Sequence, residues 1–193
     1  DYSSAKECFR TAVMLAEAHL EKDQSPKSQS QLGGHLNGLA NLLMTVDEDE
    51  QALQMFEEAI RYQKKAFDAE PRVMQFRAYL ANHYLGLGQL YVKLADPISA
   101  AKQFELRLVL LPGSARESYR TSRAIAVCVL LTENEELKSM FAKRAVELLN
   151  MAIKQGLDPS VDLAKDEAFN SVKDREDFRS LVSSRLTSRS HSQ

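Results

Sequence analysis

Apolar residues recur at helical spacing along most of the chain. One such stretch runs from Gln51 to Ala69, where the dipeptide Glu70-Pro71 interrupts it, and another begins near Arg72. Because a proline disfavours helix at the residue before it, this break predicts two separate helices. The polar, proline-containing segment 23–30 is predicted to be a loop. With only 7 glycines and 5 prolines in 193 residues, turn signals are too few for a β protein, and we expect an all-α fold.

A longer period is superimposed on the helical one. Its clearest copy consists of Tyr84, Leu87, Gly88, Tyr91, Ala100, Phe104 and Pro112. A degraded copy with the same internal spacing precedes it and consists of Leu36, Leu39, Ala40, Leu43, Ala52 and Phe56, followed by Ala59. Half a copy comes earlier at Ala5, Phe9 and Ala12, and a fourth follows at Val127, Cys128, Leu131, Ala145, Leu149 and Ala152. The chain is therefore expected to repeat one two-helix unit.

This spacing resembles the tetratricopeptide repeat, in which W-x2-L-G-x2-Y is followed by A-x3-F and P. The resemblance implies an all-α, right-handed solenoid of helical hairpins with about three and a half repeats, long helices in the first units and a short C-terminal capping helix. We expect one repeat domain over residues 1–182 and a flexible tail over 183–193. Its parts are predicted to be a half repeat at 1–22, repeats at 32–69, 72–112 and 118–155, and a cap at 158–182.

Two regions resemble a narrower group. Residues 69–81 leading into 85–91, and residues 145–149 with the closing segment 174–181, are similar to the C-terminal repeat regions of planctomycete-type bacterial serine/threonine protein kinases. This resemblance implies a larger parent protein with a kinase domain upstream. One departure from the repeat is Arg107, which stands where Ala59 and Ala152 place a small residue.

Composition narrows the classes of function. The formal net charge is -2, and basic residues alternate with acidic ones, so no concentrated basic face is expected for nucleic acid. No run of eighteen or more apolar residues predicts membrane insertion. The two cysteines, Cys8 and Cys128, lie within apolar helical patterns, which predicts buried, reduced thiols and a cytoplasmic location.

No catalytic, cofactor-binding or metal-binding residue is expected. The pair Gly86-x-Gly88 lacks the third glycine of a dinucleotide loop, and no kinase or Walker signature is present. His35 and His83 recur at the repeat spacing, but no carboxylate or cysteine accompanies them at ligand spacing. The acidic run 47–50 is expected to compensate the N-terminal charge of the helix that follows.

We expect a protein or peptide partner to bind a concave face formed by the first helix of each unit. The candidate contact residues on this face are Asn37, Asn41, Asn82, Leu85, Gln89 and Lys93. Amide side chains both donate and accept hydrogen bonds, which suits an extended main chain, and Lys93 is expected to pair with a partner carboxylate. Two alternatives remain: self-association through an apolar N-terminal end at Phe9 and Val13, and a spacer role.

Overall fold

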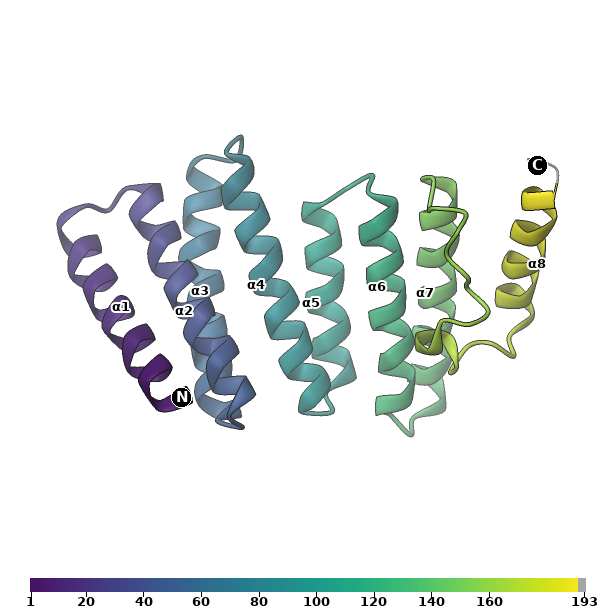
Figure 1. The fold of residues 1–193 in the computed structure, drawn as a ribbon, viewed down its shortest axis with the longest axis horizontal. Coiled ribbons are helices and arrows are strands. Elements are labelled where there is room, and N and C mark those ends of the chain that lie inside the picture. The colour runs from purple at the N-terminus through teal and green to yellow at the C-terminus, as the bar shows by residue number, and fades with distance from the viewer. Residues whose placement is uncertain (191–193) are drawn as a thin grey trace. The chain divides into compact units, whose positions relative to one another are not determined.

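The computed structural model describes residues 1–190, which contain eight α-helices and no strand, so the expected all-α fold is confirmed. The helices are α1 (Tyr2–Lys22), α2 (Pro26–Thr45), α3 (Asp49–Ala69), α4 (Met74–Lys93), α5 (Pro97–Leu110), α6 (Ala115–Cys128), α7 (Glu135–Lys154) and α8 (Glu176–Ser190) (Figure 1). Two short 3-10 turns, η1 (Val129–Leu131) and η2 (Glu167–Phe169), complete them. Within the described range, none of the helices combines the length and apolar character that crossing a membrane requires.

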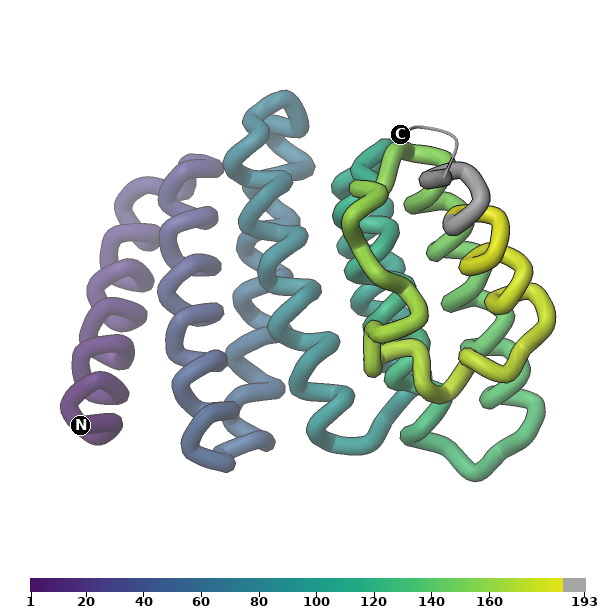
Figure 2. The backbone as a smooth tube through the Cα atoms, turned by 45° about the vertical axis from the view of Figure 1, so that its right-hand side comes forward, coloured from purple at the N-terminus to yellow at the C-terminus, as the bar shows by residue number. Residues whose placement is uncertain are grey.

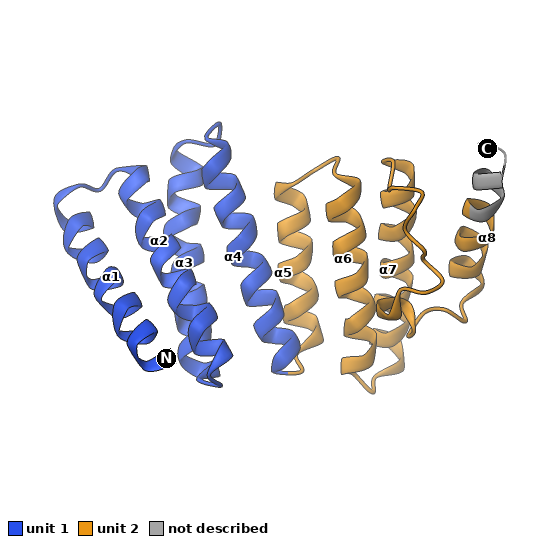
Figure 3. Ribbon diagram, viewed as in Figure 1, with its two compact units in different colours: residues 1–94 blue, residues 95–193 orange. Residues whose placement is uncertain are grey.

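The chain divides into two compact units, residues 1–94 and 95–193 (Figure 3). In unit 1, α2 packs against α1, α3 and α4. In unit 2, α6 packs against α5, α7 and η2. In each unit, therefore, one helix packs against three other elements of the same unit.

The start of α2 corrects a sequence prediction. Residues 26–30 belong to α2, although the polar composition of segment 23–30 predicts a loop. Ser25 caps the helix by accepting a hydrogen bond from the Ser28 amide, and Pro26 occupies the first turn, where its missing N–H costs nothing. The serines and the proline therefore start this helix instead of interrupting it.

The core of unit 1 repeats one aromatic contact. Phe56 on α3 is fully buried, and its ring lies where a Cβ of Gly86 on α4 would stand. The ring of Phe9 on α1 lies in the same way against Gly38 on α2. Both glycines let an aromatic ring approach the backbone of the following helix. They occupy equivalent positions of the sequence repeat.

The turns between helices follow the same repeat. Asp47, between α2 and α3, has a φ of 62°, and Ala95, between α4 and α5, has a φ of 55°. Non-glycine residues seldom adopt this left-handed conformation. Asp47 and Ala95 are separated by the same sequence offset as Gly38 and Gly86, which indicates that the two turns share one backbone geometry.

Unit 1 also contains a buried polar connection that the sequence patterns do not suggest. Gln63 on α3 is fully buried. Its Oε1 accepts a hydrogen bond from Ser30 Oγ at 3.0 Å, and its Nε2 donates to the Phe76 carbonyl at 3.0 Å. One side chain thus joins α2, α3 and the first turn of α4.

In unit 2, an ion pair explains the unexpected residue Arg107. Its guanidinium donates to Glu117 Oε2 from Nε at 3.0 Å and from Nη2 at 2.7 Å. The two side chains are only 8% and 12% exposed, so the pair lies between α5 and α6. Arg107 brings a positive charge to a position where the other repeats have an uncharged alanine, and the carboxylate of Glu117 compensates this charge.

The segment after α7 returns along α6 before α8 begins (Figure 2). Ser171 Oγ donates to the Ala126 carbonyl at 2.7 Å, and Tyr119 on α6 donates a short hydrogen bond to Asp166. Phe169 is buried and lies 5.4 Å from the ring centroid of Phe178 on α8. The predicted cap region 158–182 thus contacts α6 through the segment before α8, and Phe178 of α8 packs against this segment.

Helix α8 is longer than the sequence suggests. It starts at Glu176 and continues to Ser190, whereas the composition of residues 183–193 predicts a flexible tail. Arg185 extends from α8 to the carbonyls of Leu157 and Asp158, which fixes this part of the helix to the segment after α7. Residues 191–193 of the predicted tail lie outside the described residues.

Helix α1 has one uncovered face. None of its residues is buried, and Cys8 is exposed, which contradicts the predicted buried thiol. Phe9 and Val13 pack against the core of unit 1, whereas Leu15 is 62% exposed. On α3, Ala52 and Ala59 are the repeat counterparts of Ala5 and Ala12 and are fully buried with α2 residues. Among the elements that the structure describes, none covers the corresponding face of α1 in this way.

Candidate binding surface

All six candidate contact residues lie in unit 1, on two helices that pack against each other. Asn37 and Asn41 are on α2, and Asn82, Leu85, Gln89 and Lys93 are on α4. Asn41 and Gln89 occupy equivalent positions of the sequence repeat. The structure therefore places the predicted residues on one pair of neighbouring helices.

The two asparagines on α2 differ in their surroundings. Asn41 Nδ2 donates to the Asn37 carbonyl at 2.7 Å, and the Asn41 carbonyl accepts a hydrogen bond from Thr45 at 2.8 Å. Asn37 Oδ1 is shielded from solvent and has no hydrogen-bond partner among the described residues. Both asparagines are half-buried, so neither amide is fully open to solvent.

On α4, exposed polar side chains form a stripe. Asn82 and Gln89 are exposed and Leu85 between them is half-buried. Sequence reasoning missed Tyr79, which is 39% exposed and accepts a hydrogen bond from Gln75 Nε2 at 2.6 Å. Tyr79 lies one helical turn before Asn82 and therefore on the same face of α4. This helical spacing is the only feature of the sequence that could have identified Tyr79 as a member of the stripe.

Lys93 is already paired within unit 1. Its ammonium group donates to Asp47 Oδ1 and Asp49 Oδ1, both at 2.7 Å, and to the Met44 carbonyl at 2.9 Å. The hydrogen bonds to Asp47 and Asp49 raise the pKa of Lys93. The lysine therefore joins the end of α4 to the turn between α2 and α3, and the expected pairing with a partner carboxylate would have to compete with these bonds.

The acidic run 47–50 holds several helices together. Asp49 and Glu50 occupy the first turn of α3, as the charge argument predicts. Glu48 forms an ion pair with Lys6 on α1. With Lys93 on the other side, this turn connects α1 and α4 to the α2–α3 pair.

Burial shifts the pKa values of two side chains, His83 and Cys128, away from those useful in catalysis. Burial lowers the pKa of His83 to about 4, and neither ring nitrogen has a hydrogen-bond partner among the described residues. Burial raises the pKa of Cys128 to about 12, which is opposite to the shift that activates a thiol nucleophile. In residues 1–190, no group of three or more His, Cys, Asp or Glu side chains could hold a metal ion.

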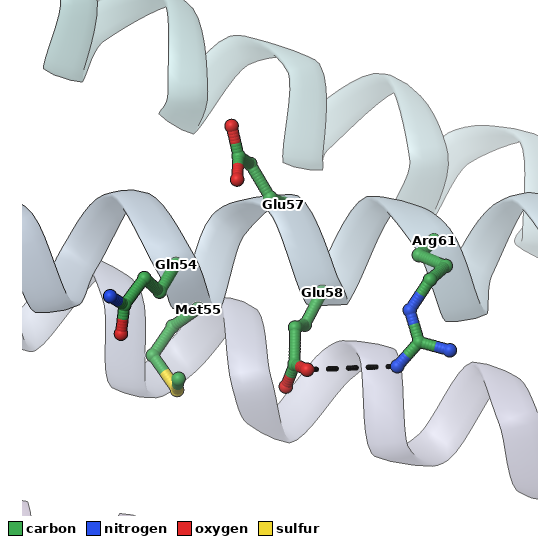
Figure 4. Close-up of a pocket in the computed structure, with 5 residues that line it drawn as sticks. All are labelled: Gln54, Met55, Glu57, Glu58 and Arg61. Carbon is green, nitrogen blue, oxygen red and sulfur yellow. Dashed lines mark ion pairs between the residues drawn. The ribbon is translucent and has the colours of Figure 1, made fainter.

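A hollow of about 450 Å³ lies on α3 (Figure 4). All of the residues that line it, Gln54, Met55, Glu57, Glu58 and Arg61, come from this single helix. Glu58 and Arg61 form an ion pair at 3.6 Å. Because no second element supplies converging groups, this hollow has the character of an ordinary helix surface.

In unit 2, the exposed side of α6 carries arginines at helical spacing. Arg116, Arg120 and Arg123 are all exposed. Arg120 pairs with Glu117 at 3.2 Å and Arg123 pairs with Asp166 at 2.9 Å. This surface is therefore basic but largely compensated, unlike the uncharged amide stripe on α2 and α4.

The chain matches no protein-family model, and no curated protein matches it at a significant level.

Proposed function

We propose that this chain is a tetratricopeptide-like helical repeat module that binds a peptide or protein segment on the exposed face of α2 and α4. The recurring Phe–Gly contacts support the repeat interpretation, and so do the two left-handed turns at equivalent positions of the repeat. Helical repeats of this kind commonly use the surface formed by successive units to hold a ligand. The module has no catalytic role in this proposal.

One observation carries the proposal. On α2 and α4, Asn82 and Gln89 are exposed and Asn41 is half-buried, and the one charged member of the candidate set, Lys93, is paired. An amide can donate to a main-chain carbonyl and accept from a main-chain N–H. A row of such groups on neighbouring helices favours an extended segment, with Tyr79 and Leu85 supplying apolar contact.

Affinity capture with matched variants tests this function. The chain and its Asn41→Ala/Gln89→Ala variant are used to capture proteins from lysate, and Gln54→Ala, an exposed amide on α3, serves as the control. We expect partners that the unaltered chain and the control retain and the double variant loses, with unchanged thermal stability in all three. Equal capture by all three would contradict the docking face, and a large stability loss in the double variant would show that the face is internal.

The narrower resemblance extends the proposal to the parent protein. We infer a regulatory or targeting region of a larger cytoplasmic signalling protein with a serine/threonine kinase domain. The similarity of segments 69–81 and 174–181 supports this interpretation. Sequencing the coding region upstream of Asp1 tests it, because a kinase domain in the same reading frame is expected and an unrelated domain would contradict it.

A second candidate function is self-association through α1. The uncovered face with Leu15 favours it, and Phe9 and Val13, named from the sequence, are not available because they pack into unit 1. In this case the molecular mass should rise with concentration, and Leu15→Glu should abolish the rise. A constant monomer mass would remove this candidate.

A further inference from the structure

Unit 2 contains an apolar groove between α5 and α7, with a volume of about 440 Å³. Ala101, Ile125 and Phe141 form its floor and are almost completely buried. Ile98 on α5 and Met140 on α7 form its sides and are 57% and 51% exposed. The volume lies within the range of about 300–1,000 Å³ typical of binding pockets. Ile98 and Met140 place exposed apolar surface on both sides of the buried floor.

The charges around this groove are unequal. Glu105 accepts two hydrogen bonds from Arg144, from Nε at 2.6 Å and Nη2 at 2.9 Å, which links the two helices and neutralises both groups. Arg144 also pairs at 3.4 Å with Glu147, which lines the groove as well, so three basic and two acidic side chains give the lining a net charge of +1. Lys102 on α5 and Lys143 on α7 also line the groove, are exposed, and have no ion-pair partner among residues 1–190.

We propose that this groove binds an acidic peptide segment in which one large apolar side chain has a carboxylate on each side. The apolar side chain would lie on the floor over Ala101, between Ile98 and Met140, where it removes both from water. The two carboxylates would meet Lys102 and Lys143, one on each helix, and the same lysines would repel a peptide of the opposite charge. This inference concerns unit 2 only and does not rest on the α2–α4 face.

Fluorescence anisotropy with defined peptides tests the proposal on the full chain. The acidic probe is a labelled octapeptide with Glu-Phe-Glu in a Gly/Ser background, and the matched probes carry Lys-Phe-Lys or Glu-Ala-Glu. We expect binding of the acidic probe alone. In the variant Lys102→Glu/Lys143→Glu, the affinity should fall by about tenfold or more, because two attractions become repulsions.

Lys173→Glu is the control, since Lys173 is an exposed lysine of unit 2 outside the groove, and it should bind the acidic probe normally. Met140→Glu should abolish binding without unfolding, because Met140 is half exposed. The proposal is overturned if the lysine probe binds as well as the acidic one, if the charge-reversed variant binds unchanged, or if nothing binds at millimolar peptide. It is equally overturned if the chain forms a dimer that Met140→Glu dissociates, because the groove would then hold a second copy.

Discussion

The contact between Phe56 and Gly86 makes a stability prediction that can be worked out from geometry. A Cβ on Gly86 would lie 2.5 Å from Cε1 and 2.9 Å from Cζ of the Phe56 ring. Both distances are far below the van der Waals contact of about 3.5 Å. Phe56 is 0% exposed, so its ring cannot relieve the contact by turning out into solvent.

Two effects of Gly86→Ala oppose each other. Replacing glycine by alanine inside a helix stabilises it by about 1 kcal/mol. Overpacking a filled core costs about 1–3 kcal/mol. We therefore expect Gly86→Ala to lower the free energy of unfolding by about 1 kcal/mol net.

Gly34→Ala is the matched control. Gly34 lies in the interior of α2 in the same unit, and a Cβ there would meet nothing within 4 Å. Only the helix-propensity effect operates, so this variant should gain about 0.5–1 kcal/mol. The difference between the two variants isolates the steric cost, because the propensity gain is common to both.

Urea unfolding followed by far-ultraviolet circular dichroism measures both changes. A third variant, Phe56→Leu with Gly86→Ala, should show a smaller penalty for the alanine than the single variant does, because leucine lacks the ring atoms in contact. If Gly86→Ala stabilised the protein as much as Gly34→Ala does, the packing of Phe56 on α4 would be refuted.

Three further predictions concern single residues. Burial lowers the pKa of His83 from its usual 6.5 to about 4, so the free energy of unfolding is highest above about pH 6.5 and decreases by up to about 3 kcal/mol as the pH falls toward 4. His83→Leu should flatten this part of a pH–stability curve, and an unchanged curve would contradict burial of the ring. Glu117→Gln removes the buried carboxylate that pairs with Arg107 and should cost about 3 kcal/mol in urea unfolding, whereas Glu58→Gln, at a half-exposed ion pair, should cost less than about 0.5 kcal/mol. Ala95→Asn should gain up to about 1 kcal/mol, because asparagine tolerates the left-handed φ of 55°; a loss in thermal unfolding would show that the turn is not strained.

The helical pattern is sufficient to predict the all-α fold and the break between α3 and α4. Glu70-Pro71 separates α3 from α4 as expected, since α3 ends at Ala69 and α4 begins at Met74. Small residues at Ala52 and Ala145 are fully buried, as their place in the repeat suggests. The helix break and the buried small residues can be predicted because they depend on the local spacing of apolar residues.

Features that depend on what covers a helix cannot be predicted in the same way. Cys8 occupies an apolar pattern like those of the buried helices, but no helix of the described part of the chain buries its face of α1. Lys93 looks available in the sequence because its partners, Asp47 and Asp49, lie 46 and 44 residues earlier in the chain, around the start of α3. The pairing of Gly86 with Phe56 also depends on the tertiary register, which a sequence template does not contain.

Site-specific photo-cross-linking tests the proposed docking face most directly. A photoreactive amino acid replaces Gln89 on α4 in one variant and Glu57, an exposed residue of α3, in another. In lysate, we predict a cross-linked partner from Gln89 and none from Glu57. Cross-links of equal yield from both positions, or from Glu57 alone, would contradict a docking face on α2 and α4.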